Sequence, residues 1–375
     1  MKIILAPDKF KNSLTGLQFC EVVQKRLEQS IKNVEVVKLP LADGGDGTID
    51  VINFYLEGKP VKVNVSNPFF KTIQATYLYA EQQKIAFIEM AEASGVKLLE
   101  KEDFDCLHST TLGTGQLILD AIKKGAKEII LGIGGSATND CGIGMATVLG
   151  YKFLDEDNNV VKPIGKNLAL INKIDDTNVL PELKHVAFKI ACDVSNPLHG
   201  ENGAAYVYAP QKGASPKDVL VLDKGLKHFS KHIDSHFNID SQSVSGAGAA
   251  GGMGIGSVVF LEGNLQSGIQ LVLELAKFNT KVKNADWIIT GEGKLDQQTL
   301  SGKTIQGVLN IAQKHQIKTA VFCGSVDLSE PALKTLGVSY ADAVINYAKN
   351  IDDAMKNSSK YLDEITLKFS EVIND

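Results

Sequence analysis

The sequence has little of what marks secreted, membrane-spanning or nucleic-acid-binding proteins. Its five cysteines are odd in number, widely spaced and without a C-x-x-C pair, which excludes a disulfide framework and a zinc signature. No apolar run approaches the roughly 20 residues that span a bilayer, and the first apolar stretch meets Asp8 too early for a signal peptide. Lys and Arg total 39 against 44 Asp and Glu, so there is no basic surplus for a phosphate backbone. We therefore expect a cytoplasmic protein that binds neither nucleic acid nor membrane.

Proline is also scarce, at 10 of 375 residues, below its usual share of about 5%. Glycine, with 34 residues, exceeds its usual share of about 7%. An excess of glycine without proline indicates tight loops on a regular scaffold. At roughly 150 residues per domain, the length predicts two or three domains.

Short apolar runs followed by helical patterns predict a parallel α/β sheet. The expected strands of this kind are 3–6, 34–39, 128–133, 287–290, 319–323 and 343–347. Three further runs, 61–65, 72–79 and 84–90, leave no room for helices between them, which indicates antiparallel strands. The predicted fold class is α/β with two domains, the first doubly wound and discontinuous in sequence, the second mixed and inserted into it. We assign residues 1–57, 105–145 and 262–375 to the first, Rossmann-like domain, and 58–104 and 146–261 to the inserted domain.

The first glycine motif is L-A-D-G-G-D-G-T, which directly follows the strand expected at 34–39. Ligands bind at strand ends in α/β sheets, and glycines let the backbone approach an anion or a metal-bound phosphate closely. The candidate ligand-binding residues here are Asp43, Gly44, Gly45 and Asp46. A solvated turn in which Asp46 caps a helix explains the same pattern.

A second motif, G-I-G-G-S-A-T-N-D, follows the strand expected at 128–133. It fits the dinucleotide fingerprint G-x-G-x-x-A, but its amides and hydroxyls would hold the phosphates of a mononucleotide equally well. Its candidate ligand-binding residues are Gly134, Gly135, Ser136, Asn139 and Asp140. A second fingerprint match at 246–251 follows a polar segment instead of a strand, and a packing loop between two backbones is the alternative there.

Charged residues also gather at other expected strand ends. The strand at 287–290 opens into G-E-G-K-L-D, whose candidates are Gly291, Glu292, Lys294 and Asp296. Asp8, with Lys9 and Lys11 nearby, follows the first strand, and Asp193 follows the apolar run 186–191. Asp193 suits a general base or a metal ligand, although an Asx-turn aspartate before Pro197 is equally compatible.

The glycine-rich loops, lysines and carboxylates described above are the groups that phosphoryl transfer requires. Loop amides and lysines hold phosphate charge, carboxylates hold Mg²⁺, and one carboxylate accepts a hydroxyl proton. The S-G-K-T at 301–304 is not a P-loop, because Gln297 occupies the position of the first Walker glycine. No G-x-S-x-G or Cys/His nucleophile arrangement is present, which disfavours acyl transfer.

Seven blocks in order resemble the bacterial class I glycerate kinase family. They are A-P-D-K-F-K-N-S-L-T-G, L-A-D-G-G-D-G-T, G-T-G-Q-L-I, G-I-G-G-S-A-T-N-D, A-C-D-V-S-N-P-L-H-G-E-N-G-A, P-Q-K-G-A and I-T-G-E-G-K-L-D-Q-Q-T-L-S-G-K. The resemblance implies two α/β-type domains around an active-site cleft and transfer of the γ-phosphoryl group of ATP, with Mg²⁺, to D-glycerate. The expected product is 2-phosphoglycerate. Two departures from the family pattern are Asp46, where the family usually has Glu, and Cys141, where it often has Gly.

The resemblance and the strand-end placement together assign expected roles. The pattern D-x-F-K-x-S falls on residues 8–13, which favours Lys11 over Lys9 for an anion and adds Ser13 as a substrate contact. Asp193 is the expected general base, with Lys11 and Asp8 as further catalytic residues. The expected metal ligands are Asp43, Glu292 and Asp296, and Lys294 is expected to contact negative charge.

Two other classes of function remain open from sequence. The dinucleotide fingerprints are compatible with an NAD(P)-dependent hydroxy-acid dehydrogenase, although Asp155 and Asp157, the acids at the required spacing, lie in a polar turn. A non-catalytic sugar-acid binding protein on the same scaffold is the third class. The expected partners are the small-molecule substrates. The one macromolecular partner that we consider is a second copy of this chain, in a homodimer. The position of phosphorylation and the substrate enantiomer are not fixed by the sequence.

Overall fold

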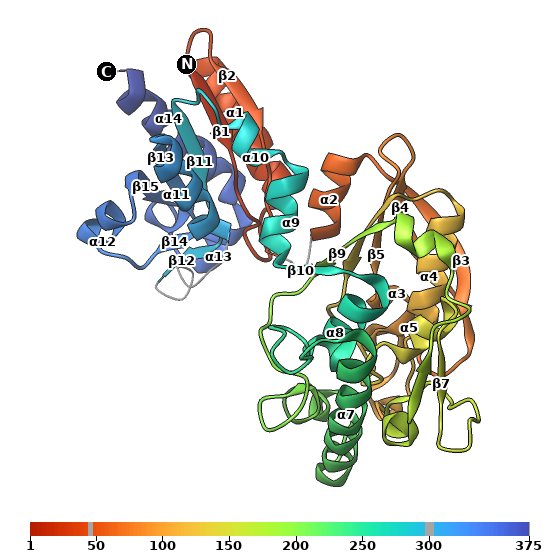
Figure 1. The fold of residues 1–375 in the computed structure, drawn as a ribbon. Helices are drawn as coiled ribbons and strands as arrows, with labels where there is room; N and C mark the ends of the chain where they lie inside the picture. The colour runs from red at the N-terminus through yellow and green to blue at the C-terminus, as the bar shows by residue number, and fades with distance from the viewer. Residues whose placement is uncertain (44–47, 297–303, 375) are drawn as a thin grey trace. The chain divides into compact units, whose positions relative to one another are not determined.

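The computed structural model describes residues 1–43, 48–296 and 304–374, and they form two compact units. Unit 1 comprises Met1–Tyr55 and Gly268–Asp375, and unit 2 comprises Leu56–Ser267. Both ends of the chain belong to unit 1, so unit 2 is inserted into it (Figure 1). No helix in the described ranges is both long enough and apolar enough to span a membrane.

Unit 1 is built on a parallel sheet. Its described residues give five strands in the order β15-β13-β11-β1-β2. Every neighbouring pair is parallel, as between Ile4 and Ile288 in the central pair of strands. The strands are β1 (Lys2–Leu5), β2 (Glu35–Lys38), β11 (Trp287–Thr290), β13 (Lys318–Cys323) and β15 (Val338–Ala343). A small parallel pair, β12 (Lys294–Leu295) and β14 (Ser325–Val326), extends from the loops.

Helices cover both faces of this sheet, as expected for a doubly wound fold (Figure 1). Phe19 of α1 and Phe369 of α14 pack on one face against Phe322, and Leu309 of α11 packs on the other against Val321. Helix α1 begins in a capping box in which Thr15 and Gln18 satisfy each other's backbone amides. The helices of unit 1 are α1 (Gly16–Ser30), α2 (Thr48–Leu56), α9 (Gly268–Leu275), α10 (Phe278–Lys281), α11 (Thr304–His315), α12 (Glu330–Thr335), α13 (Ile351–Lys356) and α14 (Ser358–Asn374).

The strand order reverses direction between β1 and β11. The chain moves from β1 to β2 on one side, and from β11 through β13 to β15 on the other. The chain connections after β1 and β11 therefore run to opposite sides of the sheet, and the carboxyl ends of these two strands form a switch point. Open α/β sheets bind their ligands at such a switch point.

Unit 2 is built on a mixed sheet, with six described strands in the order β10-β9-β6-β5-β4-β3. The first four are mutually parallel, and β4 is antiparallel to both of its neighbours. The strands are β3 (Lys59–Ser66), β4 (Thr72–Ala80), β5 (Ile85–Glu89), β6 (Glu128–Gly132), β9 (Ala187–Ala191) and β10 (Asn264–Gln266), with a separate pair β7 (Lys152–Leu154) and β8 (Lys173–Asp175). The helices are α3 (Ala91–Ser94), α4 (Leu112–Lys123), α5 (Ile143–Val148), α6 (Ala204–Tyr208), α7 (Pro216–Phe237) and α8 (Ala249–Leu261).

The predicted fold class is confirmed, but two details of the sequence interpretation are wrong. Residues 105–145 and 262–267 belong to unit 2 and not to the first domain, because β6 pairs with β5 and β9, and β10 pairs with β9, in the mixed sheet. The strand expected at 343–347 ends at Ala343, and Val344–Asn346 is a 3-10 helix, η6. Val344 is nevertheless buried, so the apolar run there reports burial and not strand structure.

Candidate active site

The loops after β1 and β11 meet at the switch point of unit 1. The amide of Asp8 donates a hydrogen bond of 2.8 Å to the carbonyl of Gly291, which joins the two loops. Gly291 is required by close packing, because a Cβ atom at this position would lie 1.8 Å from the carbonyl oxygen of Phe322. Gly291, predicted as a ligand contact, is buried and holds the loops together.

A cavity of about 690 Å³ lies at these loops. Six of the residues singled out in the sequence line it: Asp8, Lys11, Ser13, Asp43, Glu292 and Lys294. Lys9 lines it as well, whereas Asp296 does not. The predicted residues Gly44, Gly45 and Asp46 lie outside the described residues.

Asp8 is the most buried carboxylate of this group. Its side chain accepts hydrogen bonds from the Thr304 hydroxyl at 2.6 Å and from the Lys9 amide at 2.7 Å. Burial raises the pKa of the Asp8 carboxyl, the two hydrogen bonds oppose that rise, and the negative charge of Asp43 adds to it. Asp43 is brought near because the amide of Leu41 bonds to the carbonyl of Pro7. The cavity thus contains neighbouring carboxylates beside lysines.

Lys294 is exposed and lies between two acids. Its ammonium is 2.9 Å from Asp327 and 3.4 Å from Asp296. Hydrogen bonds to these carboxylates, the one to Asp327 first, raise the pKa of Lys294. Asp296, predicted as a metal ligand, therefore faces an ammonium group. In the ranges that the structure describes, no group of three or more His, Cys, Asp or Glu side chains converges to hold a metal ion.

Ser13, which was predicted to contact the substrate, makes hydrogen bonds within the protein. Its hydroxyl lies 2.7 Å from the Ser358 hydroxyl and donates a bond of 3.0 Å to the Met355 carbonyl. The loop after β1 is thereby fastened to the junction of α13 and α14.

In unit 2, the predicted phosphate-binding loop follows β6. Gly134 and Gly135 are exposed, whereas Ser136, Asn139 and Asp140 are buried. The Asp140 carboxylate accepts four hydrogen bonds: from the amide and hydroxyl of Thr111 at 2.8 and 2.9 Å, and from the amides of Gly142 and Gly144 at 3.2 and 3.3 Å. Burial raises the pKa of Asp140 despite these bonds. The contacts of Asp140 are thus with the chain itself, and they fix the shape of the loop.

Lys212, which was not singled out from the sequence, lies under this loop. Its side chain is buried and donates to the Ser136 hydroxyl at 2.7 Å and to the Thr138 carbonyl at 2.8 Å. Burial lowers the pKa of Lys212 to about 8, although the charge of Asp140 partly opposes that fall. The sequence did contain a signal that could have identified Lys212, because this residue lies in the block P-Q-K-G-A that contributed to the family resemblance.

The loop after β6 is also packed against the glycine-rich segment at the start of α8. The Cys141 amide donates to the Gly251 carbonyl at 3.0 Å, and a Cβ atom on Gly251 would lie 2.2 Å from the Thr138 carbonyl oxygen. Cys141 itself has a φ of 55°, so this position adopts the left-handed conformation without a glycine. The fingerprint match at 246–251 is explained by backbone packing.

Two carboxylates lie at strand ends near this loop. Asp193 is exposed in the loop after β9, and β9 is the parallel neighbour of β6, so both loops are at the same edge of the sheet. Glu89, which ends β5 on the other side of β6, was not singled out, although it lies in the run predicted at 84–90. Burial raises the pKa of Glu89.

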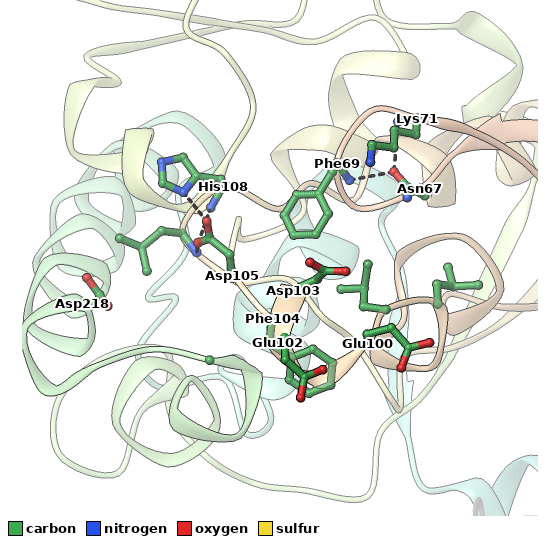
Figure 2. Close-up of a pocket in the computed structure, with 14 residues that line it drawn as sticks. Asn67, Phe69, Lys71, Glu100, Glu102, Asp103, Phe104, Asp105, His108 and Asp218 are labelled. Carbon is green, nitrogen blue, oxygen red and sulfur yellow. Dashed lines mark hydrogen bonds and ion pairs between the residues drawn. The ribbon is translucent and has the colours of Figure 1, made fainter.

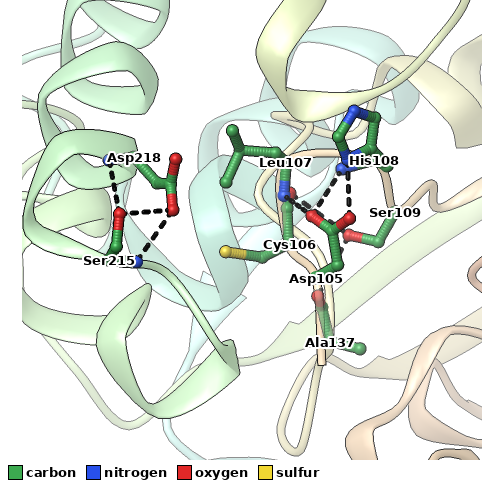
Figure 3. Close-up of polar contacts among 8 residues, drawn as sticks. All are labelled: Asp105, Cys106, Leu107, His108, Ser109, Ala137, Ser215 and Asp218. Carbon is green, nitrogen blue, oxygen red and sulfur yellow. Dashed lines mark hydrogen bonds and ion pairs between the residues drawn. The ribbon is translucent and has the colours of Figure 1, made fainter. Parts of the chain in front are cut away.

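A different cavity of unit 2, of about 750 Å³, contains none of the predicted site residues (Figure 2). Carboxylates from residues 100–105 and from Asp218 line it, and the Asp105 carboxylate contacts His108 at 2.6 Å. Figure 3 shows how its border joins the loop after β6, since the Ser109 hydroxyl donates to the Ala137 carbonyl at 3.0 Å. This cavity is an acidic surface depression next to the candidate site.

The fold and the two strand-end clusters define a class of protein. Parallel sheets whose loops gather lysines, carboxylates and glycine-supported amides supply what phosphoryl transfer to a small molecule requires. The site therefore favours a small-molecule kinase.

Comparison with known proteins identifies the family. The model of the glycerate kinase family matches residues 3–374. A glycerate kinase of Halalkalibacterium halodurans is 41% identical over 96% of this chain and 95% of its own length. The glycerate 2-kinase of Escherichia coli is 37% identical over 96% and 94%. A crystal structure assigned to glycerate kinase 2 of Salmonella typhimurium LT2 superposes with a TM-score of 0.87 at 35% identity, covering 100% of this chain and 98% of that one. The chain belongs to the glycerate kinase family, as the sequence blocks predicted.

Proposed function

We propose that this protein transfers the γ-phosphoryl group of ATP to the 2-hydroxyl of D-glycerate and releases ADP. The observation that carries the proposal is the match of the family model across residues 3–374. The name of the Escherichia coli relative, glycerate 2-kinase, supports the position of transfer. The same match disfavours the dehydrogenase and the non-catalytic binding protein.

The cavity of unit 1 suits the charged part of the reaction. Lys11 and Lys9 supply positive charge for phosphate oxygens, and Asp43 and Glu292 supply carboxylate oxygens. Mg²⁺ needs only one or two protein carboxylates, because phosphate oxygens and water complete its shell. The negative charge of Asp43 near the buried Asp8 makes this a favourable place for a cation. When bound there, the ion would neutralise the charge that develops on the phosphates.

Asp193 is our choice for the general base. Its carboxylate would take the proton of the 2-hydroxyl while the hydroxyl oxygen bonds to the γ-phosphorus and the bond from phosphorus to the ADP oxygen breaks. Its exposure and its position at a strand end support this role. Gly134 and Gly135, exposed at the tip of the neighbouring loop, offer backbone amides for substrate charge.

A coupled assay of ADP release with D-glycerate and Mg²⁺-ATP tests the proposal. Phosphorus NMR of the product should show 2-phosphoglycerate, and L-glycerate should give little turnover. A 3-phosphate product would contradict the position of transfer, and absence of glycerate-dependent ADP release would contradict the activity. ATP alone is the control for uncoupled hydrolysis.

Two further expectations remain proposals. All five cysteines are free thiols, which supports a cytoplasmic location, where thiols stay reduced. A homodimer is testable by light scattering on the purified protein.

A further inference from the structure

The cavity of unit 1 has a set of apolar residues that the sequence interpretation did not assign. They come from η6 (Val344–Asn346) and from α13 (Ile351–Lys356). We call them the apolar wall: Val344, Ile345, Ile351, Ala354 and Met355.

Two of these side chains are open to solvent. Ile351 is 68% exposed and Met355 is 37% exposed. Large apolar side chains are mostly buried in folded proteins, so two of them beside one another in a cavity mark surface that a ligand can cover. The other members of the wall are more buried and support them.

The apolar wall is fixed relative to the lysine-bearing loop. Ser13, in that loop, bonds to the carbonyl of Met355 at 3.0 Å and to the hydroxyl of Ser358 at 2.7 Å. Lys11 is therefore two residues from a direct connection to α13. The cavity therefore combines cations with an apolar surface, and the hydrogen bonds of Ser13 connect the two parts.

A ligand that uses both parts must have an apolar face and several negative charges. A nucleoside triphosphate has both, and a cavity of about 690 Å³ is of the size that binds such molecules. Glycerate is small and polar, and it has no apolar face to place on the wall. We propose that the apolar wall binds the purine base of ATP, while the loop after β1 receives its phosphates. This inference rests on the proposed function, which makes a nucleotide one of the substrates.

Binding measurements without glycerate test the base site. Isothermal titration calorimetry compares two probes, Mg²⁺-ADP and Mg²⁺-tripolyphosphate, with the wild type, Ile351→Ser and Met355→Ser. The matched control is Leu367→Ser on α14, because Leu367 is 39% exposed and does not line the cavity. Substitutions at such exposed positions leave the fold intact, which far-UV circular dichroism checks.

Each wall variant should weaken ADP binding by about three- to tenfold, because apolar contact with the base is lost. Tripolyphosphate affinity should stay within about twofold of the wild type, and Leu367→Ser should bind both probes normally. Unchanged ADP affinity in both wall variants would overturn the proposal, as would an equal loss of tripolyphosphate binding or no ADP binding by the wild type. Failure of the proposed function has a different signature, since ADP would bind and respond to the wall variants while glycerate would produce no turnover.

Discussion

Lys212 provides the most direct test of how the unit 2 loop is held. The ammonium group is buried and bonds to two uncharged oxygens, of Ser136 and Thr138. Its pKa is lowered from 10.5 to about 8 by burial. At about 1.4 kcal/mol for each tenfold change, this difference corresponds to about 3 kcal/mol against the charged form in the folded protein.

The sign of the pH dependence of stability follows from the pH at which the folded and the unfolded state each release the Lys212 proton. The unfolded chain keeps the Lys212 proton up to pH 10.5, whereas the folded protein releases it near pH 8. Between these values the unfolded state binds more protons, so the free energy of unfolding rises with pH. From pH 7 to pH 9 the wild type should gain about 1 kcal/mol from this residue alone.

Lys212→Met keeps most of the side-chain volume and removes the titrating group. It also leaves two buried acceptors without a donor, at about 1–3 kcal/mol each, so at pH 7 the lost bonds and the relieved burial of charge partly cancel. The diagnostic quantity is therefore the difference between wild type and variant as a function of pH. Urea unfolding followed by far-UV circular dichroism at pH 7, 8 and 9 measures it.

The gap in unfolding free energy should move by about 1 kcal/mol in favour of the wild type from pH 7 to pH 9. All other titrations are common to both proteins and cancel in the difference. Lys217→Met, at an exposed lysine near the start of α7, is the control for loss of a lysine as such. A gap that stays constant over this range would refute a Lys212 that titrates near pH 8 in the fold.

Three further predictions concern the two units. Asp193→Asn should lower kcat by about 10²- to 10⁴-fold in the ADP-release assay, and a variant within about threefold of wild type would remove Asp193 as the base. Asp43→Asn should raise the Mg²⁺ concentration for half-maximal activity by about tenfold, measured by metal titration at saturating ATP; an unchanged value would contradict its metal role. Gly251→Ala combines a φ of 73° with a Cβ contact of 2.2 Å to Thr138, so urea unfolding should show a loss of about 2 kcal/mol or more, and near-wild-type stability would contradict the tight packing.

The sequence predicted the strands of the fold better than their partners. Residues 287–290 coincide with β11, because an apolar run between turn residues reports a buried parallel strand directly. The run at 128–132 has the same character, and nothing in it distinguishes pairing with β1 from pairing with β5. Its placement in the wrong domain follows from that ambiguity. The runs predicted at 61–65 and 72–79 leave no room for a helix between them, and this spacing did indicate the antiparallel pair β3 and β4.

The candidate site shows a similar division. Asp8 and Glu292 were accessible to prediction, because carboxyl ends of parallel strands meet at one edge of a sheet. The burial of polar residues could not be predicted from the sequence. Asp140 stands among polar and glycine residues yet is buried, and Lys212 is a lysine in a short 3-10 helix that no periodic pattern marks as internal. Both depend on contacts with segments about 30 to 75 residues away in the chain.

The insertion of unit 2 also determines the order in which the chain can fold during synthesis. Ile3 of β1 has Trp287 as its neighbour on β11. At about 5–20 residues per second, the ribosome needs roughly 15–60 s to deliver that neighbour, and unit 2 is complete before it arrives. During this interval the apolar residues of β1 have only β2 as a sheet partner. A chain that stops before Gly268 would retain all of unit 2 but only β1 and β2 of the five-stranded sheet, and would expose an unpaired apolar edge to other nascent chains.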